Sequence, residues 1–199
     1  MWIIKSINLP EGLVAIYDNA FMETKSLESV TFPTTLEIMR VSFYGSGLKN
    51  IVIPGNVKII EGGTFQQCQN LRSVTLEEGV TSIASNAFRS ATNLNTVNLP
   101  TTLKSIGDSA FYDCAITSID LSSVETLGAG CLYSNNELRE VILSNKCTSI
   151  GDRAFYSSAT GITINLTFKG TIEEFESISK GDLWNKLGTD SQIVVSFVN

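Results

Sequence analysis

Two short stretches of the chain are almost identical: residues 105–111 read SIGDSAF and residues 149–155 read SIGDRAF. The phenylalanine that ends both stretches recurs along the chain at intervals of 22, 22, 23, 23, 21 and 23 residues. Its seven positions are Phe21, Phe43, Phe65, Phe88, Phe111, Leu132 and Phe155. A fixed period of this length is the signature of a repeat architecture, so the two stretches are the least diverged pair among seven repeats.

Two further columns of residues keep the same phase. A small residue precedes the phenylalanine in each repeat, and an aliphatic residue stands before it, at Ile16, Ile38, Ile60, Ile83, Ile106, Leu127 and Ile150. The second repeat is one residue shorter at this point, so Met39 is an alternative to Ile38. We predict that the aliphatic and phenylalanine columns are buried and that the small residue meets a spacing requirement.

The other half of each repeat alternates apolar and polar residues. Examples are LESVTF (27–32), LRSVTL (71–76) and LREVIL (138–143). Alternation at period two with β-branched residues predicts a short strand with one buried face. All 4 prolines of the chain directly follow this frame, where a proline ends a strand without removing a needed donor. One repeat cannot bury its own apolar face, so the repeats predict a mainly β solenoid with a parallel sheet.

The residues of the corner narrow this prediction. The stretches VTSIASNAFRSATNLNTVNLP (80–100) and LKSIGDSAFYDCAITSIDL (103–121) resemble the BspA-type leucine-rich repeat, which is typical of surface proteins of gut and oral bacteria. The resemblance covers nearly the whole chain and departs from the pattern at LGAGCL (127–132) and in the shortened second repeat. It implies a right-handed leucine-rich-repeat array of seven turns of 22–23 residues, and adhesion or protein binding at a cell surface without enzymatic activity.

The C-terminal residues depart from the repeat and predict a cap. We expect the solenoid to span residues 1–168 and the cap to span residues 169–199. Thr171 and Glu174 form a capping-box pattern ahead of an apolar stripe, and a lysine and a glycine at 180–181 supply a stop signal. This pattern predicts a short helix over residues 172–180. The stretch QIVVSFV predicts a final strand over residues 192–198.

Composition excludes several classes of function. A net charge of −6 argues against a surface that binds nucleic-acid phosphates, and no apolar run is long enough for membrane insertion. The start, MWIIKSINLP, lacks the features of a signal peptide, and no anchor is visible, so a secreted or cell-surface location is implied only by the family resemblance. Either this start truncates a longer array, or residues 2–4 cover the first turn.

Candidate catalytic and metal-binding groups are explained by the repeat instead. The chain has no histidine and no C-x-x-C motif, which argues against zinc. Asp108 and Asp152 share a column that accepts almost any polar or small residue, so we expect turn capping or solvent exposure there. GAG at 128–130 lacks the third glycine of a nucleotide loop. We predict no enzyme, cofactor or metal, and small core side chains at Cys68, Cys114, Cys131 and Cys147.

Two columns remain as candidate partner-binding surfaces. The first is the outward column of the strands, which we predict to bind a protein or a glycan unless it is an inert β surface: Thr31, Val52, Thr75, Asn98, Asp120 and Ile142. The second is an aromatic column, which offers a sugar or protein platform unless its rings pack on one another: Tyr44, Tyr112, Tyr133 and Tyr156. The sequence therefore favours a non-catalytic binding or adhesion module, with a structural spacer as the alternative. It leaves the oligomeric state open.

Overall fold

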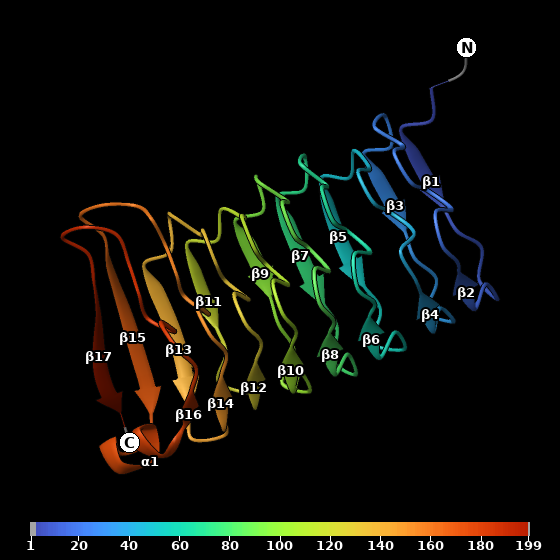
Figure 1. Cartoon of the computed structure of the whole chain (residues 1–199). Coiled ribbons are helices and arrows are strands. Elements are labelled where there is room, and N and C mark those ends of the chain that lie inside the picture. Colours follow the sequence, from blue (N-terminus) through green and yellow to red (C-terminus); the bar gives the residue numbers. More distant parts are fainter. Residues whose placement is uncertain (1–2, 199) are drawn as a thin grey trace.

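The computed structural model describes residues 3–198 and is a solenoid in which longer strands alternate with two-residue strands (Figure 1). The longer strands are β1 (Ser6–Asn8), β3 (Ser29–Thr31), β5 (Asn50–Ile53), β7 (Ser73–Leu76), β9 (Thr96–Asn98), β11 (Ser118–Asp120), β13 (Glu140–Ser144), β15 (Thr163–Lys169) and β17 (Gln192–Val198). The two-residue strands are β2 (Ala15–Ile16), β4 (Ile38–Met39), β6 (Ile59–Ile60), β8 (Ser82–Ile83), β10 (Ser105–Ile106), β12 (Thr126–Leu127), β14 (Ser149–Ile150) and β16 (Ser179–Lys180). The helix α1 spans Ile172–Ser177.

Every strand pairing within the described residues is parallel, and each pairs one turn with the next. On the longer strands, for example, Val74 lies opposite Ile51 and Val97. On the two-residue strands, Ile106 lies opposite Ile83 and Leu127. Equivalent repeat positions therefore lie side by side, which confirms the predicted mainly β parallel solenoid.

The phenylalanine column forms a stack of rings through the core. Neighbouring ring centroids from Phe21 to Phe111 lie 4.9, 5.5, 5.3 and 5.2 Å apart, with interplanar angles of 12° or less. Leu132 interrupts the stack, and Phe155 beyond it meets Trp184 edge-on at 6.1 Å. The rings thus stack at close to the spacing of about 4.8 Å that hydrogen-bonded ladders impose on successive turns.

The aliphatic column is also buried, with a shift in the second turn. Met39 is fully buried and lies opposite Ile16, whereas Ile38 is 38% exposed. Met39 thus fills the aliphatic position, as the shorter second repeat suggested. The missing residue lies between β4 and Phe43; the pairing of β2 with β4 is kept, but β4 does not pair with β6, where the ladder of two-residue strands begins again.

The ladder of longer strands is interrupted twice. It consists of β1–β3, β5–β7–β9 and β11–β13–β15–β17, although β5 and β11 still lie beside the strands that precede them (Figure 1). Both interruptions follow a loop that is one residue short: three positions separate Cys68 from Leu71, but only two separate Ser46 from Leu48 and Cys114 from Ile116. We infer that the shorter loop holds β5 and β11 out of register with the preceding strand.

At the C-terminal end, the helix is shorter than predicted. The capping box of Thr171 and Glu174 is present, but α1 ends at Ser177, so the prediction that it continues to residue 180 was wrong. Ser179 and Lys180 instead form β16, which pairs with β14. The helix ends here because both residues of β16 gain a partner on β14 in the existing ladder.

The segment after β16 is an eighth copy of the repeat corner. Residues 179–185 read SKGDLWN, in register with SIGDRAF at 149–155. The Arg153 N–H donates to the Asp182 carbonyl at 3.0 Å, as the Ser109 N–H donates to the Ala129 carbonyl at 2.8 Å. β17 likewise pairs with β15. Both ladders therefore run on into residues 169–199, and the division at residue 168 remains a prediction.

The N-terminal end is open. Ile3 and Ile4 are 61% and 63% exposed, and together with Ile7, Phe21 and Leu27 they line an apolar groove of 450 Å³. These two residues therefore do not seal the first turn. Residue 2, which the sequence offered as further cover, lies outside the described residues.

Candidate functional site

The cysteines and aspartates of the repeat lack the arrangement of a catalytic site. All four cysteines are free and buried, and the Cys68 and Cys114 thiols lie near the carbonyls of Phe43 and Phe88 at 3.1 and 3.3 Å. Burial raises the pKa of the Cys68 thiol to about 11 and that of Cys131 to about 12. These thiols are therefore protonated at neutral pH, as expected of small core side chains.

The two aspartates of the repeated stretch do not form an acid–base pair. The Asp108 carboxylate accepts a hydrogen bond from the Ala129 N–H at 2.7 Å, so it ties its own corner to the next turn. Asp152, two turns away, lies 3.9 Å from the Arg153 guanidinium. Within residues 3–198, no group of three or more histidine, cysteine, aspartate or glutamate side chains is placed to hold a metal ion.

The sheet face, defined as the outward side of the longer strands, carries the first predicted column. Register places its members opposite one another within each ladder segment: Val52 with Thr75, Thr75 with Asn98, and Asp120 with Ile142. Thr31 lies opposite Asn8 on the first segment. Val52 is 53% exposed, whereas Thr75 and Ile142 are half-buried. The predicted residues thus share one face but fall into three segments.

The sheet face also contains residues that the sequence analysis did not select. Thr167 and Ser196 continue the predicted column onto β15 and β17. A second outward row runs beside it, at Ser29, Asn50, Ser73, Thr96, Ser118 and Glu140. The alternation within each strand could have identified this row from the sequence, because residues two positions apart point to the same side.

Internal hydrogen bonds engage several side chains of this face. The Asn98 side-chain amide donates to the Thr75 hydroxyl at 3.1 Å, and the Ser73 hydroxyl donates to the Asn50 side-chain oxygen Oδ1 at 2.7 Å. Asp120 accepts from the Ser122 N–H at 2.9 Å. These bonds hold the side chains in fixed positions, so the face is a preorganised surface of hydroxyl and amide groups.

One hollow opens on the sheet face where the ladder is interrupted between β9 and β11. Its volume is 260 Å³, and its lining includes Asn98, Ser118, Asp120, Glu140 and Ile142. Two carboxylates and three apolar residues, Val97, Ile119 and Ile142, therefore line the same depression.

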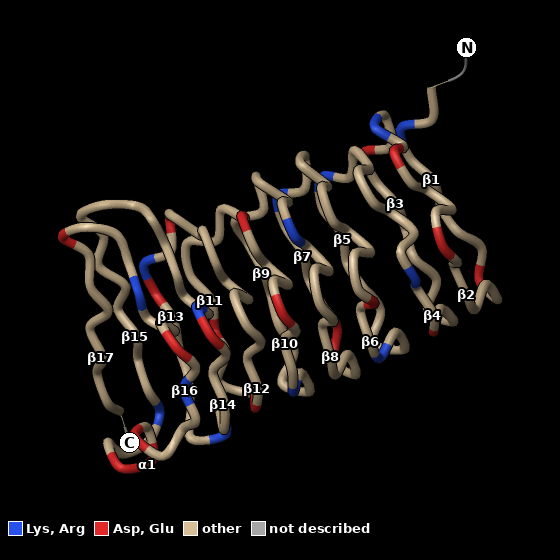
Figure 2. Tube along the Cα trace, in the orientation of Figure 1, with Lys and Arg blue, Asp and Glu red and all other residues tan. Residues whose placement is uncertain are grey.

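Charged residues border the beginnings of the longer strands (Figure 2). Glu28, next to β3, pairs with Lys5 at 3.5 Å and with Lys49 at 2.6 Å on the turns to either side. These two ammonium groups, Lys49 first, lower the pKa of the Glu28 carboxyl. Lys5, Glu28 and Lys49 are thus paired with one another across three successive turns.

The aromatic column is a stack of rings. The Tyr112 and Tyr133 centroids lie 4.8 Å apart, Tyr133 and Tyr156 lie 4.6 Å apart, and the Arg89 guanidinium covers Tyr112 at 4.4 Å. Desolvation, followed by the neighbouring tyrosines, raises the pKa of the Tyr133 phenol. A sugar stacks on the face of a ring, and here the ring faces cover one another. Tyr44 stands apart, because Gln66 and Arg89 occupy the column between it and Tyr112.

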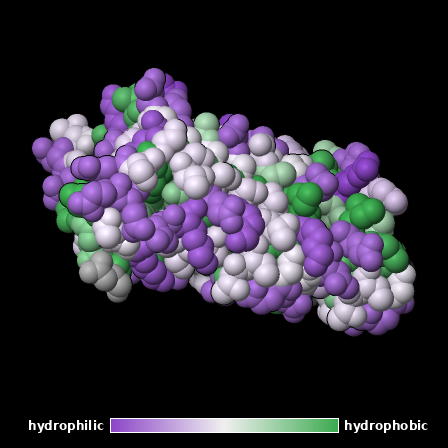
Figure 3. All heavy atoms as spheres, turned by 90° about the horizontal axis from the view of Figure 1, so that it is seen from below, coloured by the Kyte–Doolittle hydropathy of each residue, from purple (hydrophilic) through white to green (hydrophobic). Residues whose placement is uncertain are grey.

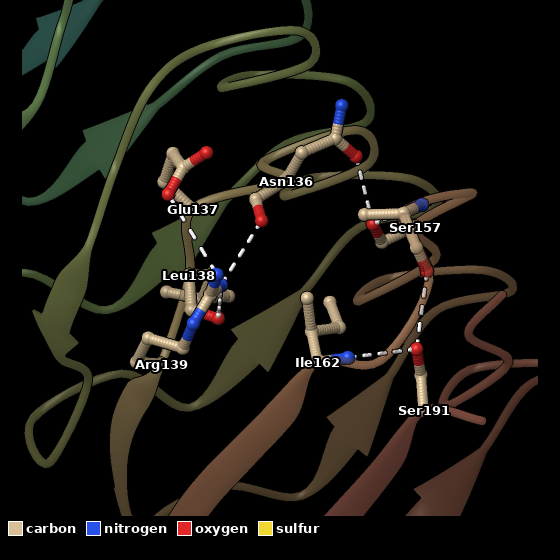
Figure 4. Close-up of polar contacts among 8 residues, drawn as sticks. Asn136, Glu137, Leu138, Arg139, Ser157, Ile162 and Ser191 are labelled. Carbon is tan, nitrogen blue, oxygen red and sulfur yellow. Dashed lines mark hydrogen bonds and ion pairs between the residues drawn. The ribbon is translucent and has the colours of Figure 1, made fainter. Parts of the chain in front are cut away.

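The loops that lead into the last strands are joined by polar contacts (Figure 4). The Ser157 hydroxyl donates to the Asn136 side-chain carbonyl at 2.7 Å. The Ser191 hydroxyl accepts from the Ile162 N–H at 3.1 Å and donates to the Ala159 carbonyl at 3.1 Å. These contacts fix the start of β17 against the preceding turn.

The stacked turns, the strand frame and the phenylalanine corners define a leucine-rich repeat solenoid. A model of the BspA type leucine rich repeat region matches residues 2–90 and 59–179 with 6 copies. The chain belongs to the BspA-type leucine-rich repeat family. Comparison with curated protein sequences gives no match.

Solved structures of other proteins share this fold. One is a leucine-rich cell surface protein from Faecalibacterium prausnitzii A2-165, with a TM-score of 0.57 and 20% identity over 88% of this chain and 62% of that one. Another is a leucine-rich repeat protein of T. pallidum, with a TM-score of 0.54 and 22% identity over 70% of this chain and 72% of that one. This chain thus spans less than two thirds of the length of the Faecalibacterium protein.

Within residues 3–198, no helix is long and apolar enough to cross a membrane.

Proposed function

We propose that this chain is a non-catalytic binding or adhesion module of an exported or cell-surface protein, and that it recognises a protein or a glycan through the sheet face. The observation that carries the proposal is the solvent-facing, preorganised array of short polar side chains on the longer strands, centred on Thr75 and Asn98. The partner is recognised through complementarity between its surface and the sheet face. The hollow beside Asp120 and Glu140 supplies carboxylate acceptors for a donor-rich group of the partner.

The surface location rests on the family and on the kind of protein that shares its fold. One structural neighbour is described as a leucine-rich cell surface protein. The absence of a paired acid–base site among the repeat aspartates and the protonated state of the buried cysteines favour binding over catalysis.

A triple arginine variant of the sheet face tests the proposal. Thr75→Arg, Asn98→Arg and Asp120→Arg together place three long cations across the centre of the face. The control, Glu61→Arg, Ser85→Arg and Thr126→Arg, makes the same change of net charge on exposed residues around the two-residue strands. Glycan and protein arrays of the wild-type chain first identify a binder, and both variants are then titrated against it.

We expect the sheet-face variant to lose binding by at least tenfold while the control retains it. Binding that survives in the sheet-face variant would reject this face and direct attention to the tyrosine column, where Tyr133→Ala is the next variant. A wild-type chain that binds nothing on either array would favour the alternative function, a structural spacer that holds other domains apart.

A further inference from the structure

Exposed apolar side chains gather at the ends of the solenoid. At the C-terminal end they are Ile172, Leu183, Val194, Phe197 and Val198, with exposed fractions from 39% to 50%. Between Ile59 and Ile172, by contrast, no described large hydrophobic side chain is exposed. Viewed from below, hydrophobic residues concentrate toward the two ends of the molecule (Figure 3). A solenoid end exposes its core in this way unless something covers it.

The last strand of the described residues, β17, is long and uncharged. β17 has seven residues and pairs only with β15 among the described residues. It also extends one turn beyond β16, the last strand of the other ladder. Natural proteins normally protect such an edge with charges, a proline or a covering element. β17 has neither charge nor proline, and the Ser191 contacts hold its start in place (Figure 4).

The backbone groups on this edge can be assigned from the ladder. The Gln192 N–H donates to the Ile162 carbonyl and the Val198 carbonyl accepts from the Gly170 N–H, so both residues face β15. In a parallel ladder, the backbone groups of successive residues point to opposite sides. The N–H and C=O groups of Ile193, Val195 and Phe197 therefore point to the open edge.

We propose that β17 pairs with β17 of a second copy of this chain, antiparallel about a two-fold axis at Val195. In this register Val195 lies opposite its own copy and Ile193 lies opposite Phe197. All three residues then exchange both backbone hydrogen bonds with the partner strand, which is the hydrogen-bonded pair of an antiparallel ladder. The interface is isologous and closed, so it produces a dimer and no filament.

The packing beneath β17 supports a second copy as the occupant. Phe175 of α1 meets Phe197, near the C-terminal end of the strand, at 5.9 Å edge-on, and Phe197 remains 39% exposed. Ile193 and Val195 remain partly exposed on the core side. The two-fold axis brings the partner's Phe197 and α1 beside Ile193, so each copy supplies the cover that the other lacks.

The opposite end of the solenoid is less suited to this pairing. Its edge strand, β1, has only three residues, and the charged residues Glu23 and Lys25 line the apolar groove there. The uncharged β17 faces no like charge when it meets its copy. Dimerisation would also place two sheet faces in one continuous sheet, which gives bivalent binding to a repetitive partner.

The mass of the chain in solution tests this proposal. We expect light scattering across a concentration series to approach twice the 21.6 kDa of one chain. Val195→Pro removes an N–H that the ladder within one copy does not use. It should therefore raise the dimer dissociation constant at least tenfold. A double variant, Gln192→Lys with Val198→Lys, places like charges opposite each other and should also yield monomers, whereas Gln192→Lys with Val198→Glu pairs opposite charges and should restore the dimer.

Three outcomes would overturn the proposal. They are a wild-type chain that stays monomeric at every concentration, a mass above the dimer, and a Val195→Pro variant that dimerises like the wild type. The two double variants at residues 192 and 198 keep the proposal testable if the proline variant fails to fold, because their substitutions leave every backbone N–H in place. If the chain is monomeric but binds a partner on the arrays, the dimer proposal fails and the proposed function stands, because that function needs only one sheet face.

Discussion

The phenylalanine stack makes a quantitative prediction about how the turns are held together. Phe88 is fully buried and lies between Phe65 and Phe111, at centroid distances of 5.3 and 5.2 Å. Phe88→Leu keeps most of the buried volume but removes both aromatic pairs. The change of shape costs up to about 1.5 kcal/mol, and each pair is worth about 0.5–1.5 kcal/mol beyond its buried area. We expect the free energy of unfolding to fall by about 1–4.5 kcal/mol.

Phe155→Leu is the matched control for this prediction. Phe155 is equally buried but has only one aromatic neighbour, Trp184, because Leu132 occupies the preceding position. The same atoms are deleted in both variants, so the difference between them reports one aromatic pair, about 1 kcal/mol. Urea unfolding measures the loss of unfolding free energy in both variants, provided that the slope of this free energy against urea concentration is unchanged. Equal costs for the two variants would show that buried volume alone, and not ring stacking, couples the turns.

Four more variants test other parts of the structure. Met39→Ala should lower the free energy of unfolding by about 2–5 kcal/mol, whereas Ile38→Ala, at an exposed position, should cost about 0.5 kcal/mol or less in the same urea assay. The pKa of the Glu78 carboxyl is lowered, first by the Thr101 backbone N–H at 2.9 Å and less by its hydroxyl. This bonding therefore stabilises the fold fully above the ordinary pKa of 4.5, and the contribution is lost as the pH falls below 4.5. Glu78→Gln should thus lower the melting temperature at pH 7 but not at pH 2. An asparagine inserted after Ala115 restores the full loop length, and hydrogen exchange should then show slower exchange in β9 and β11; unchanged exchange would reject loop length as the cause of the interruption.

Much of the fold could be predicted from the repeat because each column has one physical requirement. The phenylalanine and aliphatic positions must be buried in every turn, so their recurrence identified the core, including Met39 as the alternative in the second turn. The eighth corner, at residues 179–185, was missed because its core positions hold Lys180, Trp184 and Asn185, which break the pattern of residue types. Its backbone geometry is nevertheless retained, since the corner is held by hydrogen bonds from Arg153 and Phe155 to the carbonyls of Asp182 and Trp184.

The candidate site was less predictable, because it depends on where residues are missing. The gap in the second turn lies between Met39 and Phe43, and the pairing of β2 with β4 survives it. The gap before Ile116 lies in the loop that leads directly into β11, and there the pairing with β9 is lost. The pairing of β4 with β6, which follows the gap in the second turn, is lost as well, so each missing residue lies next to an interruption of a ladder. The hollow beside Asp120 opens at the interruption between β9 and β11. The missing residue leaves the repeat pattern recognisable in the sequence, but it produces a depression on the sheet face that the pattern does not reveal.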